Sequence, residues 1–128
     1  MAIVVDTDVV SFIFKKDTRA RLFESHLVNV PKFISFMTFA ELRSWELQSS
    51  WGQSKSQMFE LLLSDFGVIY ADGKLCNIWA NTTNESKKKG RPISTADAWI
   101  AATALMFEIP LVTNNRKHFE HLPGLSIL

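Results

Sequence analysis

The chain has 128 residues and a formal net charge of +1 at pH 7, with 47% hydrophobic and 21% charged residues. This length supports one hydrophobic core, so we expect a single domain over residues 1–128, and no apolar run reaches membrane-spanning length. The single cysteine, Cys76, excludes an internal disulfide and a cysteine-bound zinc cluster, and its apolar neighbours predict a core position. The first residues lack the basic flank and cleavage site of a signal peptide, which favours a cytoplasmic protein.

The first half of the chain opens on a short, wholly apolar run, Ile3-Val4-Val5, which predicts a strand buried on both faces. Asp17 is the expected N-cap of a helix, and Pro31 bars helix before the next apolar run. The other elements expected in this half are helices over residues 8–16, 17–26, 38–51 and 53–66 and a strand over residues 33–37.

The second half alternates in the same way. We expect a strand over residues 68–71, a helix from Asp72 to residue 87 and a basic loop over residues 87–92. A helix capped by Ser94 or Thr95 should follow and run to residue 107. The remaining elements are a strand over residues 111–113, a short helix from Arg116 and a possible edge strand over residues 125–128. This alternation predicts an α/β fold with a parallel sheet of four or five strands, the first strand central and helices on both faces.

Three acidic residues fall at one edge of such a sheet. Asp6 ends the first strand, and Glu41 and Asp97 lie in the first turns of the predicted helices at 38–51 and 95–107. These positions share the carboxyl edge, where open α/β sheets build their sites. Each acid also has a simpler interpretation as a helix cap, Asp6 directly and the other two within capping boxes.

Because the three acids are expected to converge on one edge of the sheet, a metal site is favoured over three unrelated helix caps. Asp97 lies on the same helical face as Ile100 and Ala101, which is the inward face. Carboxylates that meet repel one another and raise each other's pKa unless a cation neutralises them. Oxygen-only ligands favour Mg²⁺ or Mn²⁺, and because no histidine is expected nearby, zinc is disfavoured.

Four motifs in this chain resemble those of a known family: an apolar strand ending in Asp6-Thr7, then Ser35-x-x-Thr38-x-x-Glu41-Leu42, then Asp97-Ala98-Trp99-Ile100-Ala101-Ala102-Thr103-Ala104, then Leu111-Val112-Thr113-Asn114-Asn115-x-x-x-Phe119. In order and spacing they are similar to the PIN domain, and most of all to the VapC-type toxins of bacterial toxin–antitoxin pairs. The resemblance implies a three-layer α/β/α domain and a magnesium- or manganese-dependent endoribonuclease, with Asp6, Glu41 and Asp97 as metal ligands. It also implies a VapB-like antitoxin, a homodimer, and a transfer RNA as substrate.

One position departs from the family pattern. Many members have an acid where this chain has Asn115. An amide orients a water or a phosphate but adds no charge for a second metal, so a one-metal site is favoured. Thr7 and Thr113, beside the acids, either hydrogen-bond a metal-bound water or are ordinary strand-end hydroxyls.

An RNA substrate needs cations on the protein. Two basic groups flank the acids in sequence, and each either binds phosphate or is a solvated surface. They are Lys87, Lys88, Lys89 and Arg91, and Lys15 and Lys16 with Arg19 and Arg21. In addition, 12% of the residues are aromatic, and we expect a helical face rich in Phe and Trp to be covered by a second copy or by the antitoxin.

Two other functions remain open. Asp6-x-Asp8 after an apolar strand matches the nucleophile motif of haloacid-dehalogenase-type phosphatases, with Asp6 phosphorylated and Asp8 as acid and base; however, no acid follows the fourth strand, and Glu41 would have no role. The other is a degenerate PIN domain that binds RNA or protein without cutting, for which Asn115 is the support.

Overall fold

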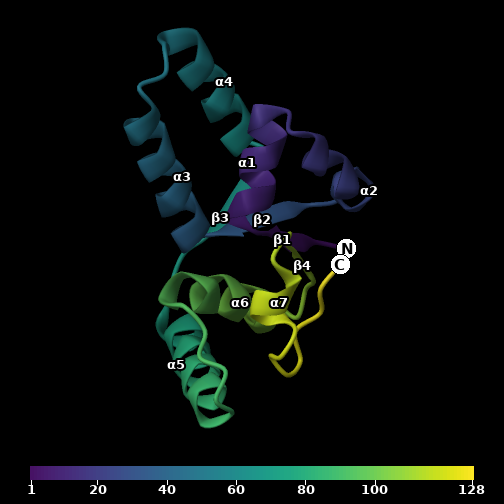
Figure 1. The fold of residues 1–128 in the computed structure, drawn as a ribbon, viewed down its shortest axis with the longest axis vertical. Coiled ribbons are helices and arrows are strands. Elements are labelled where there is room, and N and C mark those ends of the chain that lie inside the picture. Colours follow the sequence, from purple (N-terminus) through teal and green to yellow (C-terminus); the bar gives the residue numbers. More distant parts are fainter.

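The computed structural model describes residues 1–128 and contains a four-stranded parallel sheet between two layers of helices (Figure 1). The strands lie in the order β3-β2-β1-β4, with bounds β1 (Ile3–Val5), β2 (Lys32–Ser35), β3 (Phe66–Ile69) and β4 (Leu111–Val112). Val4 of β1 pairs with Phe33 on one side and Leu111 on the other. The predicted three-layer α/β/α fold with a central first strand is therefore confirmed.

The helices follow the predicted order with shifted ends. They are α1 (Thr7–Lys15), α2 (Glu24–Leu27), α3 (Phe36–Ser49), α4 (Gln53–Leu63), α5 (Gly73–Lys88), α6 (Thr95–Phe107) and α7 (Arg116–Phe119), with a 3-10 helix, η1, at Thr18–Leu22. Asp17 caps η1 as predicted, because its Oδ1 accepts the Arg19 N–H. The helix expected over residues 17–26 is instead divided into η1 and α2, and residues 125–128 form only a bridge between Ile127 and Leu111.

The boundary between β2 and α3 lies two residues earlier than the sequence predicted. Ser35 is the N-cap of α3, and its hydroxyl oxygen accepts the Thr38 N–H at 3.0 Å. The expected capping box from Thr38 to Glu41 is therefore wrong, and Glu41 lies in the second turn of the helix. Apolar Phe36 and Met37 read equally well as strand or helix, and the cap decides between them.

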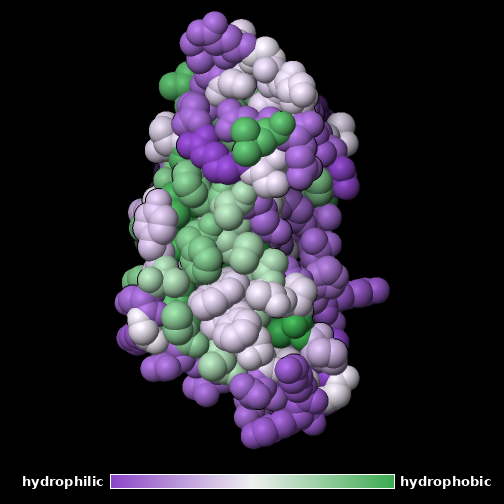
Figure 2. Space-filling view, turned by 90° about the vertical axis from the view of Figure 1, so that its left-hand side faces the viewer, coloured by the Kyte–Doolittle hydropathy of each residue, from purple (hydrophilic) through white to green (hydrophobic).

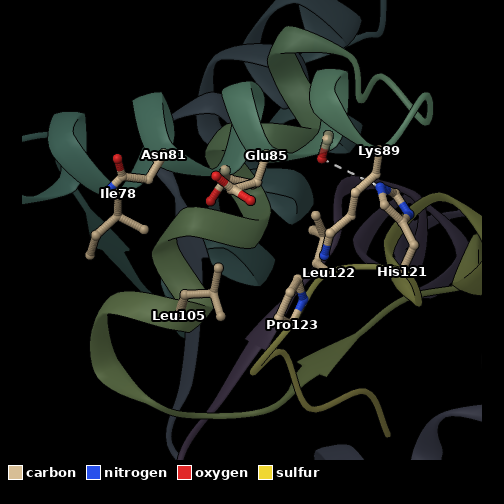
Figure 3. Close-up of a pocket in the computed structure, with 10 residues that line it drawn as sticks. Ile78, Asn81, Glu85, Lys89, Leu105, His121, Leu122 and Pro123 are labelled. Carbon is tan, nitrogen blue, oxygen red and sulfur yellow. Dashed lines mark hydrogen bonds between the residues drawn. The ribbon is translucent and has the colours of Figure 1, made fainter.

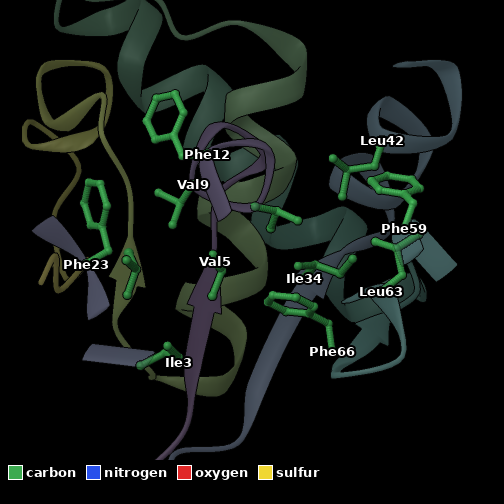
Figure 4. Packing of buried hydrophobic residues seen from close by; sticks show 12 residues of the cluster. Ile3, Val5, Val9, Phe12, Phe23, Ile34, Leu42, Phe59, Leu63 and Phe66 are labelled. Carbon is green, nitrogen blue, oxygen red and sulfur yellow. The ribbon is translucent and has the colours of Figure 1, made fainter. Parts of the chain in front are cut away.

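The alternation of side chains along β1 divides the core between the two faces of the sheet. Ile3 and Val5 face a cluster contributed by α1, α3 and α4 (Figure 4). Val4 faces a second cluster with Ile100 and Ala101 of α6. All three β1 side chains are fully buried, so β1 is a rigid base for whatever follows it.

Helix α5 lies outside these layers and packs on α6 (Figure 1). Cys76 lies on the outward side of α5 and is exposed, so its predicted core position is wrong; its neighbour Leu75 is fully buried instead. None of the helices combines the length and the apolar composition that a membrane-spanning helix requires.

Candidate active site

A cavity of about 270 Å³ opens at the carboxyl end of β1; we call it the acid cavity. Its lining consists of Asp6, Thr7, Asp8, Ser11, Glu41, Asp97, Ile100, Asn115 and His118. The structure thus brings together the three predicted acids, from the end of β1, from α3 and from α6. It adds Asp8, Ser11 and His118, which were not predicted as parts of a metal site.

Asp6 is the most enclosed acid of the cavity, with 4% of its surface exposed. Its Oδ1 accepts the Thr7 N–H at 2.8 Å, which makes it the N-cap of α1. Its Oδ2 accepts the Thr113 hydroxyl at 2.7 Å. Asp6 therefore has two roles. Its Oδ1 caps α1, and its Oδ2 is held by Thr113 at the wall of the cavity.

The electrostatics around Asp6 favour its neutral form. Burial, and to a smaller extent the charges of Asp8 and Asp97, raise the pKa of Asp6 from 3.8 to about 7, although the hydrogen bonds from Thr113 and Thr7 oppose this shift. Burial also raises the pKa of Asp8. No Lys or Arg lines the cavity, so the carboxylates repel one another with no fixed cation between them.

Glu41 is held by a chain of hydroxyl groups. Thr7 Oγ1 lies 2.7 Å from Glu41 Oε1 and 2.9 Å from Thr38 Oγ1. Because a carboxylate only accepts, the Thr7 hydroxyl proton points to Glu41. Thr38 is fully buried against Ser35, so the cap of α3 also fixes Thr7, and Thr7 in turn orients Glu41.

Asp97 faces His118 across the cavity, with its Oδ2 3.1 Å from the imidazole Nδ1. The expectation that no histidine lies near the acids is therefore wrong: α7 returns to the edge of the sheet directly after β4 and carries His118 into the cavity. The sequence signal was the spacing from Asn115 to His118, which spans one turn of α7. One imidazole among four carboxylates still makes an oxygen-rich ligand set.

Asn115 and Thr113 complete the wall on the β4 side. The Asn115 side-chain amide donates to Asp8 Oδ2 at 2.9 Å, and the Asn115 N–H donates to Thr113 Oγ1 at 3.0 Å. The hydroxyl of Thr113 is thus oriented toward Asp6. Asn115 therefore donates a hydrogen bond to Asp8 and adds no charge to the cavity.

The donor set suits a hard divalent cation, although the side chains do not enclose one as they stand. No three acidic, histidine or cysteine side chains form a cluster that could hold a metal ion. Each acid is instead turned to its own donor: Asp6 to Thr113, Glu41 to Thr7 and Asp97 to His118. Carboxylate oxygens that lack a Lys or Arg partner nevertheless match the ligand preference of Mg²⁺ and Mn²⁺.

The predicted cations are divided among several surfaces. Lys15 lines a hollow that it shares with Glu41, and Arg91 lines one that it shares with Asp97. Lys16 instead lines a groove with Leu27 and Phe66. Lys89 lines a hollow between α5, α6 and the C-terminal segment, where Ser86 and His121 are hydrogen-bonded and none of the cavity acids is present (Figure 3).

Two further basic residues remain apart from the acids. Lys87 and Lys88 lie in the last turn of α5 and line none of these hollows, and Lys88 pairs with Glu85 at 3.7 Å. The structure therefore brings only Lys15 and Arg91 of the predicted RNA-binding cations beside the acid cavity.

Comparison with known proteins assigns this chain to a family. The PIN domain model matches residues 3–125. Ribonuclease VapC1 of Haemophilus influenzae (strain R2866) is 31% identical, covering 98% of this chain and 96% of the relative, and Ribonuclease VapC1 of Methanocaldococcus jannaschii is also 31% identical, covering 98% and 85%. The solved structure of VapBC-1 from nontypeable Haemophilus influenzae matches with a TM-score of 0.84 at 30% identity, covering 100% of this chain and 97% of that one.

The chain belongs to the PIN-domain family. Within it, the chain groups with proteins named as VapC ribonucleases, as the sequence motifs indicated.

Proposed function

We propose that this protein is a VapC-like, metal-dependent endoribonuclease that hydrolyses RNA phosphodiester bonds. The observation that carries the proposal is the acid cavity, where Asp6, Asp8, Glu41 and Asp97 meet with no Lys or Arg between them. Relatives that match nearly the whole chain are named ribonucleases, and the cavity lies at the strand edge where an α/β fold builds its site.

In this proposal Asp6, Glu41 and Asp97 would hold Mg²⁺ or Mn²⁺, and the metal would supply Lewis acidity for the attacking water and for the phosphate charge. The chain's own residues set the ligands in place. Thr113 and the Thr7 N–H fix Asp6, the Thr7 hydroxyl fixes Glu41, and His118 fixes Asp97. Such supporting hydrogen bonds orient ligands and tune their basicity.

The partners follow as part of the same proposal. The matching Haemophilus structure is a VapBC complex, which supports a VapB-like antitoxin that holds this protein inactive. A transfer RNA is the proposed substrate, and we propose a homodimer in addition.

The surface offers apolar area for such partners. Figure 2 shows an apolar band on the side of the molecule that carries α3 and α5. Leu47 of α3 is 84% exposed. The aromatic residues Phe14, Trp45, Trp51 and Phe59, by contrast, pack against one another. Among the most exposed large apolar side chains, only Tyr70 and Phe107 are aromatic, and the coverage of a Phe- and Trp-rich face by a second copy or an antitoxin stays a prediction.

The phosphatase alternative is not favoured by this geometry. It requires a lysine near Asp6 and Asp8, and none lines the cavity. Asp8 is also engaged by the Asn115 amide. The other alternative is a degenerate PIN domain that binds RNA or protein without cutting, which we call the binding module. It rests on Asn115, and it is one outcome of the test below.

The test is cleavage of purified transfer RNA by the purified protein. Cleavage should require Mg²⁺ or Mn²⁺, stop with EDTA, and disappear in Asp97→Asn. Asp65→Asn, an exposed aspartate that does not line the acid cavity, is the matched control and should cut like the wild type. RNA binding without cleavage under every metal would reject the nuclease and leave the binding module.

A further inference from the structure

Two hollows adjoin the acid cavity and share its walls. The first, of about 190 Å³, lies between α1 and α3 and is lined by Thr7, Ser11, Lys15, Glu41, Leu42 and Trp45. The second, of about 360 Å³, is lined by Arg91, Pro92, Ile93, Ser94, Asp97, Lys117, His118 and His121. The acid cavity shares Glu41 with the first and Asp97 with the second, so it lies between them.

The two hollows carry the positive charge that the acid cavity lacks. Lys15 lines the first, and Arg91 and Lys117 line the second. None of these three is in an ion pair, whereas Arg19, Arg43 and Lys88 are each paired with a nearby acid. Unpaired cations therefore stand on both sides of a group of carboxylates.

We propose, on the basis of the proposed ribonuclease function, that a single RNA strand crosses the acid cavity from one hollow to the other. Lys15 binds a phosphate on one side of the scissile bond, and Arg91 and Lys117 bind a phosphate on the other. Acids repel a polyanion, so the strand is held by the nearest free cations. Contacts to phosphate position a nucleic acid without reading its sequence.

The geometry favours an unpaired strand over a duplex. Asp6 is only 4% exposed, so the reacting phosphate has to enter a recess while its neighbours occupy the hollows. A strand held against its complement lacks the freedom to bend into three adjoining recesses. The first hollow also offers the Trp45 ring, with Lys15 Nζ 6.0 Å from its centroid, and aromatic rings stack on unpaired bases.

The chain provides matched controls one residue away from two of these cations. Lys16 follows Lys15 but lines the groove with Leu27 and Phe66. Arg116 precedes Lys117 and lines neither hollow. Each pair removes one positive charge at adjacent positions of the chain, so a general charge effect would be equal within a pair.

The experiment measures binding of a fluorescein-labelled uridine octamer in EDTA, by anisotropy, over a range of salt concentrations. Lys15→Ala and Lys117→Ala should each weaken binding about fivefold or more and lower the slope of log affinity against log salt by about 0.7, the loss of one phosphate contact on a single strand. Lys16→Ala and Arg116→Ala should stay within about twofold of wild type with an unchanged slope. A blunt duplex of the same length should bind more weakly, with little effect of any substitution.

Several results would overturn this strand path. The first is an equal loss of octamer affinity for the two variants of each pair. The second is a duplex that binds as tightly as the octamer and is weakened equally by the substitutions. The third is a wild-type protein that does not bind the octamer. Metal-dependent cleavage by the wild type is measured separately. Cleavage with equal losses within each pair would reject the path and keep the nuclease, whereas pair-specific binding without cleavage would keep the path and reject the nuclease.

Discussion

The two faces of the sheet are covered in different ways, and the acids of the cavity come from both. On one face, α1, α3 and α4 pack through large rings, with Phe14 and Phe59 centroids 4.9 Å apart. On the other face, α6 packs through small residues, with Ala98, Ala101 and Ala104 at most 1% exposed. The layer on one face is therefore filled by large rings, and the layer on the other face by small side chains.

This difference bears on how each acid is positioned. Asp97 lies in the first turn of the closely packed α6, and Asp6 follows the buried β1. Glu41 lies on α3, and its carboxylate is fixed through the Thr7 hydroxyl. We therefore expect packing to hold the backbone at Asp6 and Asp97 in addition to their hydrogen bonds, whereas the carboxylate of Glu41 depends on one hydrogen bond that can be removed on its own.

The largest expected effect concerns cleavage. Asp6→Asn and Asp97→Asn should each lower the rate of RNA cleavage by about a thousandfold or more, which corresponds to roughly 4 kcal/mol. Glu41→Gln should cost less, about a hundredfold, since Glu41 is the more adaptable ligand. Single-turnover rates of RNA cleavage at saturating Mg²⁺ measure these losses. An equal loss for all three variants would show that Glu41 is not more adaptable than Asp6 and Asp97.

The next effect is a pH dependence of stability that originates at Asp6. Its pKa is about 7 in the folded protein and 3.8 ordinarily, so between these values the folded state binds more protons than the unfolded state. Stability of the metal-free protein should therefore rise as pH falls from 8 toward 4, by a contribution on the order of 4 kcal/mol. Urea unfolding in EDTA should show this slope, and Asp6→Asn should flatten it; a wild type whose stability falls over that range would contradict it.

Packing of the two helices can be compared by the same substitution on each. Ala101→Leu should overfill the space between α6 and the sheet, where Ala101 is fully buried, and destabilise the protein by about 1–3 kcal/mol. Ala40→Leu, on the exposed side of α3, should change stability by no more than about 0.5 kcal/mol. Similar midpoints of urea unfolding for both variants would show that the space around Ala101 is not fully packed.

The smallest effect isolates the hydroxyl that holds Glu41. Thr7→Val keeps the shape of the side chain and removes its donor, so cleavage should fall about tenfold, and metal should bind more weakly. Thr7→Ser keeps the hydroxyl and should restore most of the rate. A Thr7→Val protein with wild-type metal affinity, measured by calorimetry with Mn²⁺, would mean that Glu41 needs no such support.

Much of the fold and the gathering of the acids could be predicted from the sequence, because apolar runs such as Ile3-Val4-Val5 have one plausible environment. The convergence of Asp6, Glu41 and Asp97 follows from topology alone: in a parallel sheet all strands end at one edge. The boundary at Ser35 could not be fixed, because Phe36 and Met37 suit strand and helix alike and a single side-chain cap decides.

Two of the residues that the sequence missed, His118 and Lys117, come from the last part of the chain. His118 and Lys117 lie on α7, a helix of four residues whose direction depends on how the chain leaves β4. Its periodicity is too short to indicate a face. Asp8 was considered only within a phosphatase motif, and its contact with Asn115 joins residues 107 apart in sequence.

That separation has a consequence for biosynthesis. The Thr113 hydroxyl that orients Asp6 also lies 107 residues along the chain from it, and β4 is the neighbour that makes β1 an inner strand. A ribosome that has made the first hundred residues has delivered every acid of the cavity but not the wall that holds them. We therefore expect the proposed nuclease to be inert during translation and to become active only after β4 has left the ribosome and paired with β1.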